Sequence, residues 1–135
     1  MVSLKKILNK ILKSLTGVET KTLLWTNASP TSVFAAQTIS LDLSGYDTVE
    51  IVSQFITSNV GQTVEKCEFG SRVFVEKFYN ATSTSAHATI MHRQIDVNPG
   101  GVAFADAKSK VVDENTSTTN NSLLIPYKIY GIKVV

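Results

Sequence analysis

Hydrophobic residues follow two different periods along the chain, and the change from one to the other falls at Gly17. Before Gly17, apolar residues recur every three or four positions, as they do on one face of an α-helix. After it, apolar and polar residues alternate in short runs that are separated by turn residues, which is typical of β-strands. The pattern therefore predicts an N-terminal helix followed by a β domain.

The predicted helix occupies residues 1–17, with Ser3 suited to cap its start and Gly17 suited to end it. At roughly 100° per residue, six apolar side chains share one arc: Leu4, Ile7, Leu8, Ile11, Leu12 and Leu15. Four lysines lie opposite, and the segment has no acidic residue. A helix of about four turns is marginally stable alone in water, so the apolar stripe is expected to bury itself on a partner.

The spacing of the stripe favours self-association. Four of its residues are separated by 4, 3 and 4 positions, like alternating d and a positions of a coiled coil: Leu4, Leu8, Ile11 and Leu15. Ile7 and Leu12 widen the stripe beyond a two-position seam, which suits a trimer, a larger bundle or docking into a groove of another protein. We expect a homotrimer, with docking onto a partner protein as the main alternative.

Two further alternatives for the helix receive less support. A basic amphipathic helix also resembles helices that lie on membrane surfaces, but this one is short and lacks Trp and Phe. Packing back onto its own domain is the other alternative. No apolar run approaches the 18 or so residues that cross a bilayer, so we expect no membrane span.

The rest of the chain predicts a mainly β fold. Residues 18–22 are interpreted as a short polar linker, and residues 23–135 as one domain. About seven to nine strands at nearly regular spacing, without helical segments between them, predict an antiparallel β-sandwich or jelly roll. Gly70-Ser71 is expected to form the turn of a hairpin between strands near 64–69 and 72–79.

Charge and cysteine content narrow the possible partners and location. The net charge of +2 hides an asymmetry, because nine basic and eleven acidic residues follow Gly17 and give that part a charge of −2. With no nucleic-acid motif either, we expect no nucleic-acid partner. Cys67 is the only cysteine and is expected to be a small buried hydrophobe. Lys10 and Lys13 interrupt the segment that could act as a signal peptide, so we expect an unsecreted chain.

The sequence offers no recognisable catalytic or metal site. His87 and His92 are five residues apart, which places them on opposite faces of a strand and disfavours a shared metal. Neither a nucleophile elbow nor a phosphate-binding loop is found. We therefore expect a non-enzyme with no catalytic residues, no metal and no cofactor. A small polysaccharide-degrading enzyme is a remote alternative, with carboxylates drawn from scattered acids: Glu50, Glu65, Glu68, Glu76 and Asp96.

Aromatic and arginine side chains are the remaining candidates for ligand contacts. Four aromatic residues could stack on sugar rings, although filling the core is the commoner role: Trp25, Tyr79, Tyr127 and Tyr130. Arg72 and Arg93 are the only arginines, and each could anchor an anionic ligand or be an ordinary strand-face charge. The residues that would contact a receptor are not identifiable from the sequence.

Two segments resemble a known group of proteins. The segment Leu23–Ile51, LLWTNASPTSVFAAQTISLDLSGYDTVEI, is similar to the opening of small proteins encoded in tail and host-recognition regions of phages and prophages of Gram-positive bacteria. Residues Leu124–Lys133, LIPYKIYGIK, resemble the terminal strand of the same proteins. The two segments bracket the β domain, whereas residues 52–122 match only in general β character.

The resemblance implies a virion structural protein. It points to a tail or fibre head, often trimeric, that is made in the host cytoplasm and contacts the bacterial surface, for which we expect a cell-wall glycan as receptor. The helix lies outside the shared pattern and is expected to assemble the chain or dock it on other virion proteins. A capsid-decorating or adaptor protein is the alternative.

Overall fold

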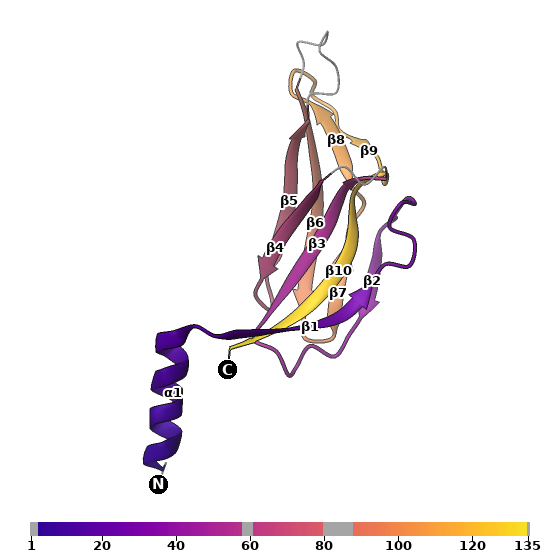
Figure 1. Ribbon diagram of the computed structural model, residues 1–135. Helices are drawn as coiled ribbons and strands as arrows, with labels where there is room; N and C mark the ends of the chain where they lie inside the picture. Colours follow the sequence, from indigo (N-terminus) through magenta and orange to yellow (C-terminus); the bar gives the residue numbers. More distant parts are fainter. Residues whose placement is uncertain (1–2, 58–60, 80–87, 135) are drawn as a thin grey trace.

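The protein folds as a sandwich of two antiparallel β-sheets with one N-terminal helix, as the periodicity predicts (Figure 1). This computed structural model describes residues 3–57, 61–79 and 88–134, and for residues 13–16 and 79 it describes the backbone alone. Helix α1 covers Leu4–Thr16, and the described residues contain ten strands.

A four-stranded sheet has the order β1-β10-β3-β4. Its strands are β1 (Glu19–Thr26), β10 (Leu123–Val134), β3 (Thr48–Ile56) and β4 (Gln62–Cys67). The register of β10 against β3 shifts between Pro126 and Lys128. A proline cannot donate a ladder hydrogen bond, so its place beside an irregularity explains how a central strand accommodates it.

A six-stranded sheet forms the second layer around its longest strand, β6 (Thr89–Asn98). On one side β6 pairs with β5 (Arg72–Tyr79). On the other side, β7 (Gly101–Phe104) pairs with its second half and β8 (Lys108–Val111) with its first half. The short strands β2 (Gln37–Ser40) and β9 (Thr118–Thr119) pair with β7 and β8, respectively.

The core lies between the two sheets and consists of the inward side chains at alternate positions along the strands. On β6 these are Met91, Ile95 and Val97, which face Ile51 of β3, Ile129 of β10 and their neighbours in one buried cluster. Cys67 is 1% exposed, as predicted for a small buried hydrophobe. Burial raises the pKa of its thiol to about 11.

A charged residue, Arg93, stands on this core-facing side of β6 and is completely buried. Its guanidinium donates hydrogen bonds to four backbone carbonyls, those of Phe34, Ala105, Leu123 and Leu124, at 2.6–3.2 Å. These bonds join three segments: the loop that contains Phe34, the break between β7 and β8, and the start of β10. The predicted roles of Arg93, an anion anchor or a strand-face charge, are therefore wrong: it organises the backbone of three segments.

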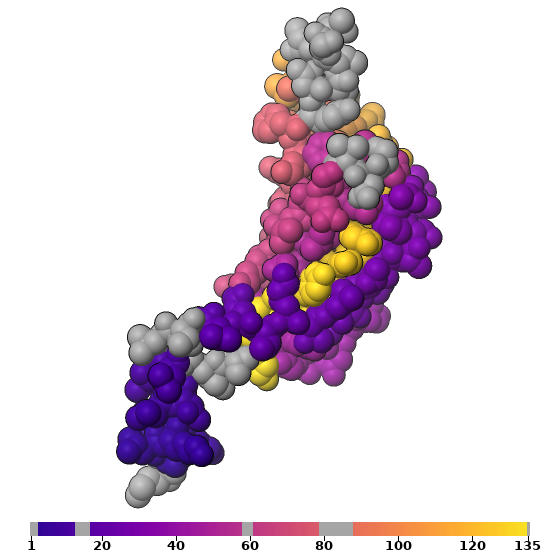
Figure 2. Space-filling view, in the orientation of Figure 1, coloured from indigo at the N-terminus to yellow at the C-terminus, as the bar shows by residue number. Residues whose placement is uncertain are grey.

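Helix α1 begins and ends as its sequence predicts. The Ser3 hydroxyl accepts a hydrogen bond from the Lys6 amide at 3.3 Å, and Gly17 follows the last turn with a φ of +55°. That left-handed conformation favours glycine after a helix. The helix extends away from one end of the sandwich, close to the end of β10 (Figure 1; Figure 2).

Two further details differ from the sequence prediction. The predicted linker 18–22 is largely part of β1, because residues 19–22 pair with β10 from Val134 to Gly131. Its alternating polar residues look like a linker in sequence, but they occupy an edge strand with exposed side chains. Gly70-Ser71 does not close a hairpin either: β4 pairs with β3 and β5 pairs with β6, so this turn carries the chain from one sheet to the other.

Candidate functional site

The stripe predicted on α1 is an exposed apolar surface. Its described side chains are 45–73% exposed: Leu4, Ile7, Leu8, Ile11 and Leu12. The side chain of Leu15 lies outside the described residues. Among the described residues, no strand of the sandwich packs extensively against α1. The structure thus places the five described residues of the predicted stripe on one face of a helix that stands apart from the core.

The other face of α1 is basic. Lys5, Lys6 and Lys10 are exposed, and the first turn contains no acidic residue. The helix therefore combines an apolar stripe with a polar back that carries lysines, which fits a helix that packs through one side and leaves the other in solvent. No helix in the described part of the chain is long and apolar enough to span a membrane.

Ion pairs between side chains of different strands lie on the outer face of the four-stranded sheet. Lys21 Nζ lies 2.7 Å from Glu50 Oε1 and 4.9 Å from the centre of the Tyr130 ring, and Glu19 pairs with Lys66. The hydrogen bond to Glu50 is the main reason why the pKa of Lys21 is raised. These contacts pair two lysines with two glutamates and place Lys21 over the Tyr130 ring.

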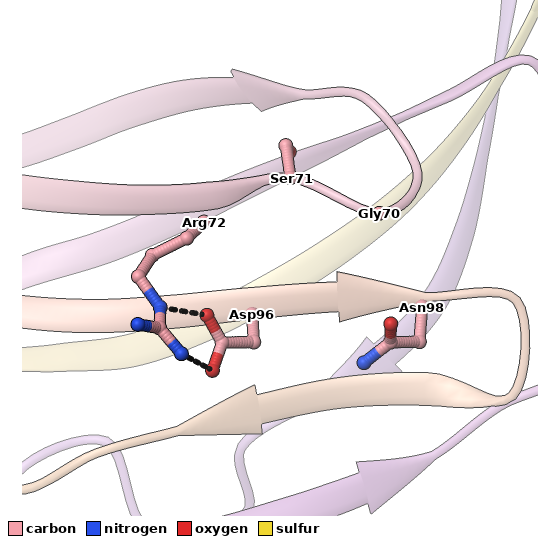
Figure 3. A pocket seen from close by; sticks show the side chains of 5 residues that line it. All are labelled: Gly70, Ser71, Arg72, Asp96 and Asn98. Carbon is pink, nitrogen blue, oxygen red and sulfur yellow. Dashed lines mark hydrogen bonds and ion pairs between the residues drawn. The ribbon is translucent and has the colours of Figure 1, made fainter.

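The outer face of the six-stranded sheet is hollowed at one end (Figure 3). A pocket of about 390 Å³ is lined by residues of the β4–β5 turn and the facing ends of β5 and β6: Gly70, Ser71, Arg72, Asp96 and Asn98. The register of β5 and β6 places Arg72 opposite Asp96. Asn98 follows two residues later on the same face of β6.

Arg72 and Asp96 form a two-pronged ion pair. Arg72 Nε donates to Asp96 Oδ1 at 2.8 Å, and a terminal guanidinium nitrogen donates to Oδ2 at 3.2 Å. This contact lowers the pKa of Asp96 and raises that of Arg72. Gln94 donates a further hydrogen bond to Asp96 Oδ2 at 3.2 Å. The result is a fixed row of planar polar groups on an exposed surface.

Two phenylalanines continue this face along β5. Phe74 is 50% exposed and pairs with Gln94, and Phe78 is 73% exposed and pairs with Ile90. Sequence reasoning missed both residues, although a signal existed. Strict alternation puts them on the strand face that carries Arg72 and Glu76, whereas Val73 and Val75 point to the core.

Three of the four aromatic residues considered for sugar stacking contact other side chains of the protein. Trp25 packs against the core, with its ring 6.3 Å from that of Phe34 in an edge-to-face arrangement. Lys128 Nζ lies 4.9 Å from the Tyr127 ring centre, and Lys21 covers Tyr130 in the same way. The side chain of Tyr79 lies outside the described residues.

The remaining candidates for chemistry do not converge. His92 lies on the outer face of β6 opposite Glu76, and His87 lies outside the described residues. Within the described residues, no group of three or more His, Cys, Asp or Glu side chains could hold a metal ion. Of the five acids considered for an enzyme, Asp96 lines the polar pocket, and Glu50 belongs to the opposite sheet.

Comparison with known protein families finds no family model that matches this chain, and no curated protein matches it either. The fold and the two surfaces described above are therefore the basis for a functional proposal.

Proposed function

We propose that this protein is a phage virion component, a tail or fibre head that attaches to the bacterial surface as a homotrimer. In this proposal α1 assembles the chains or anchors them to the virion, and the sandwich displays the binding surface. The observation that carries it is the exposed apolar stripe of α1, which stands apart from a sandwich whose core is complete without it. The resemblance of the β1–β3 region and β10 to phage host-recognition proteins supports the same assignment.

Self-association explains both the spacing and the exposure of the stripe. Leu4 and Leu8 fit successive d and a positions, and Ile7 beside them broadens the contact to more than two helices. The side chains of the stripe are largely exposed in the single chain. An isolated helix of this length is marginally stable in water, so burial of the stripe on a partner is expected to stabilise it. Three copies bury it on one another and leave the lysines outside.

Trimer formation also fits attachment to a repetitive surface. A wall glycan presents many copies of one sugar unit, and three weak sites on one particle bind it with much higher avidity than one site does. The sandwich then needs only a modest saccharide site on its surface. Attachment requires no catalytic step, so the proposal is of a non-enzyme with no cofactor.

A second candidate is an adaptor or capsid-decorating protein, and the charge of α1 is the observation that favours it. The helix has lysines and no acid, so identical copies repel one another, whereas an acidic groove on another virion protein attracts it. Salt separates the two possibilities. Raising the ionic strength strengthens a self-assembled bundle by screening its lysines, and weakens binding to an acidic partner.

The test of the proposed function is to locate the protein in an assembled particle and to measure its binding to host walls. Antibody labelling at a tail tip, together with sedimentation of purified protein with wall preparations from Gram-positive bacteria, is the expected result. Labelling on the capsid, with no wall binding, would support the adaptor instead. Release of reducing sugar from the wall preparation would overturn the assignment as a non-enzyme.

A further inference from the structure

The pocket at the β4–β5 turn has the chemistry of a sugar site. Its wall alternates hydrogen-bond donors and acceptors within a short distance: the guanidinium of Arg72, the carboxylate of Asp96 and the amide of Asn98 (Figure 3). Planar groups of this kind bind two neighbouring hydroxyls at once, each of which donates one hydrogen bond and accepts another. A volume of about 390 Å³ is near the lower limit for ligand pockets, a size suited to one sugar unit.

The pocket is built before any ligand arrives. The ion pair fixes the orientation of Arg72 and Asp96, and Gln94 holds the second carboxylate oxygen at 3.2 Å. The turn is held as well, because the Gly70 amide donates to the Val97 carbonyl at 2.8 Å. A ligand therefore meets Arg72 and Asp96 already hydrogen-bonded to each other, which lowers the entropy cost of ordering these two side chains on binding.

Charge and surroundings select the ligand class. Asp96 neutralises Arg72, so the pocket has no net positive charge for a phosphate or carboxylate and only one acidic group for a cation. Phe74 follows Arg72 by two positions on the same face and offers a half-exposed ring beside the polar groups. A polar cluster next to a flat apolar face matches a sugar, which has hydroxyl edges and apolar C–H faces.

We propose that a neutral sugar unit binds this pocket through Arg72, Asp96 and Asn98, and that the glycan continues along β5 over Phe74. This assignment rests on the proposed function, since it names the ligand class and the place of contact for the attachment surface. The site lies on the outer face of the six-stranded sheet, away from the ion-paired face of the other sheet. Phe78 extends the same face toward the opposite end of β5.

The experiment is an NMR titration of the isotopically labelled full chain with four named sugars: N-acetylglucosamine, glucose, galactose and rhamnose. We expect at least one to cause saturable amide shifts confined to residues 70–74 and 94–98. Asp96→Asn and Phe74→Ala should each weaken that binding by about tenfold, the effect of losing one good polar or stacking contact. Lys66→Gln, which breaks an exposed ion pair on the other sheet, is the matched control and should leave the affinity unchanged.

The outcomes separate this inference from the proposed function. Saturable shifts that map to another surface would overturn the pocket and leave attachment to glycans standing. Wall binding that survives Asp96→Asn and Phe74→Ala unchanged would do the same. If no sugar causes a saturable shift and the protein binds no wall preparation, both proposals fail. Spectra of the variants also report folding, so a loss of binding through unfolding is recognised directly.

Discussion

Replacing Arg93 with methionine tests how the sandwich is held together. Methionine keeps a long apolar side chain in the core but removes every donor, so four backbone carbonyls lose their partner. A buried group left without a hydrogen bond costs about 1–3 kcal/mol, so four cost at least about 4 kcal/mol. Part of this loss of stability is offset, because Arg93→Met also removes the cost of burying a charged guanidinium. That cost is visible in the pKa of Arg93, which burial lowers to about 10.

We therefore expect Arg93→Met to lower the free energy of unfolding by about 3 kcal/mol, a large share of the 5–15 kcal/mol typical of a domain. Urea unfolding followed by circular dichroism, at one protein concentration, measures the change. Arg72→Met is the matched control, because that side chain is 60% exposed and its ion pair should contribute less than about 1 kcal/mol. Arg93→Lys retains the charge but not the geometry and should fall between them. Equal unfolding midpoints for Arg93→Met and Arg72→Met would refute the reasoning.

Three further predictions concern stability and reactivity. Asp106 accepts hydrogen bonds from the Ala36 amide and the Asn121 side chain, and these bonds lower its pKa below the ordinary 3.8. The contribution of Asp106 to the free energy of unfolding should therefore be complete above pH 3.8 and be lost as the pH falls through the lower pKa of the folded state. Urea unfolding at several pH values should show a weaker acid dependence in Asp106→Asn. Cys67 is buried and the pKa of its thiol is raised to about 11, so it should react with a thiol reagent only after unfolding. If the folded protein were labelled as fast as a free thiol, this prediction would be wrong. Gly101→Ala should lower the unfolding midpoint markedly, because its Cβ would collide with the Ile39 carbonyl, whereas Gly45→Ala, where the space is open, should not.

Most of the fold could be predicted because the two hydrophobic periods are clear. Ser3 and Gly17 bound the helix where local capping chemistry requires, and the alternation in 72–79 matches β5 to the residue. The pairing of strands could not be predicted in the same way. Gly70-Ser71 resembles a hairpin turn locally, but whether a turn joins neighbours or changes sheets depends on long-range burial.

The role of Arg93 in the core and the make-up of the candidate site were less predictable, for reasons that differ between residues. Arg93 looks like a surface charge in sequence, since nothing local shows that distant carbonyls converge on it. The pairing of Arg72 with Asp96 arises from a register set across 24 positions of the chain. Phe74 could have been identified from alternation alone, because it shares a strand face with charged residues.

The mass of the full chain in solution tests the central claim, that α1 assembles the protein and the sandwich displays it. Multi-angle light scattering should give about 44 kDa, three times the 14.7 kDa of one chain. Leu4→Gln with Leu8→Gln should reduce this to the monomer mass with the sandwich still folded, whereas Lys6→Gln with Lys10→Gln should leave it unchanged. A monomeric wild-type chain, or a trimer that survives the two leucine substitutions, would contradict the account.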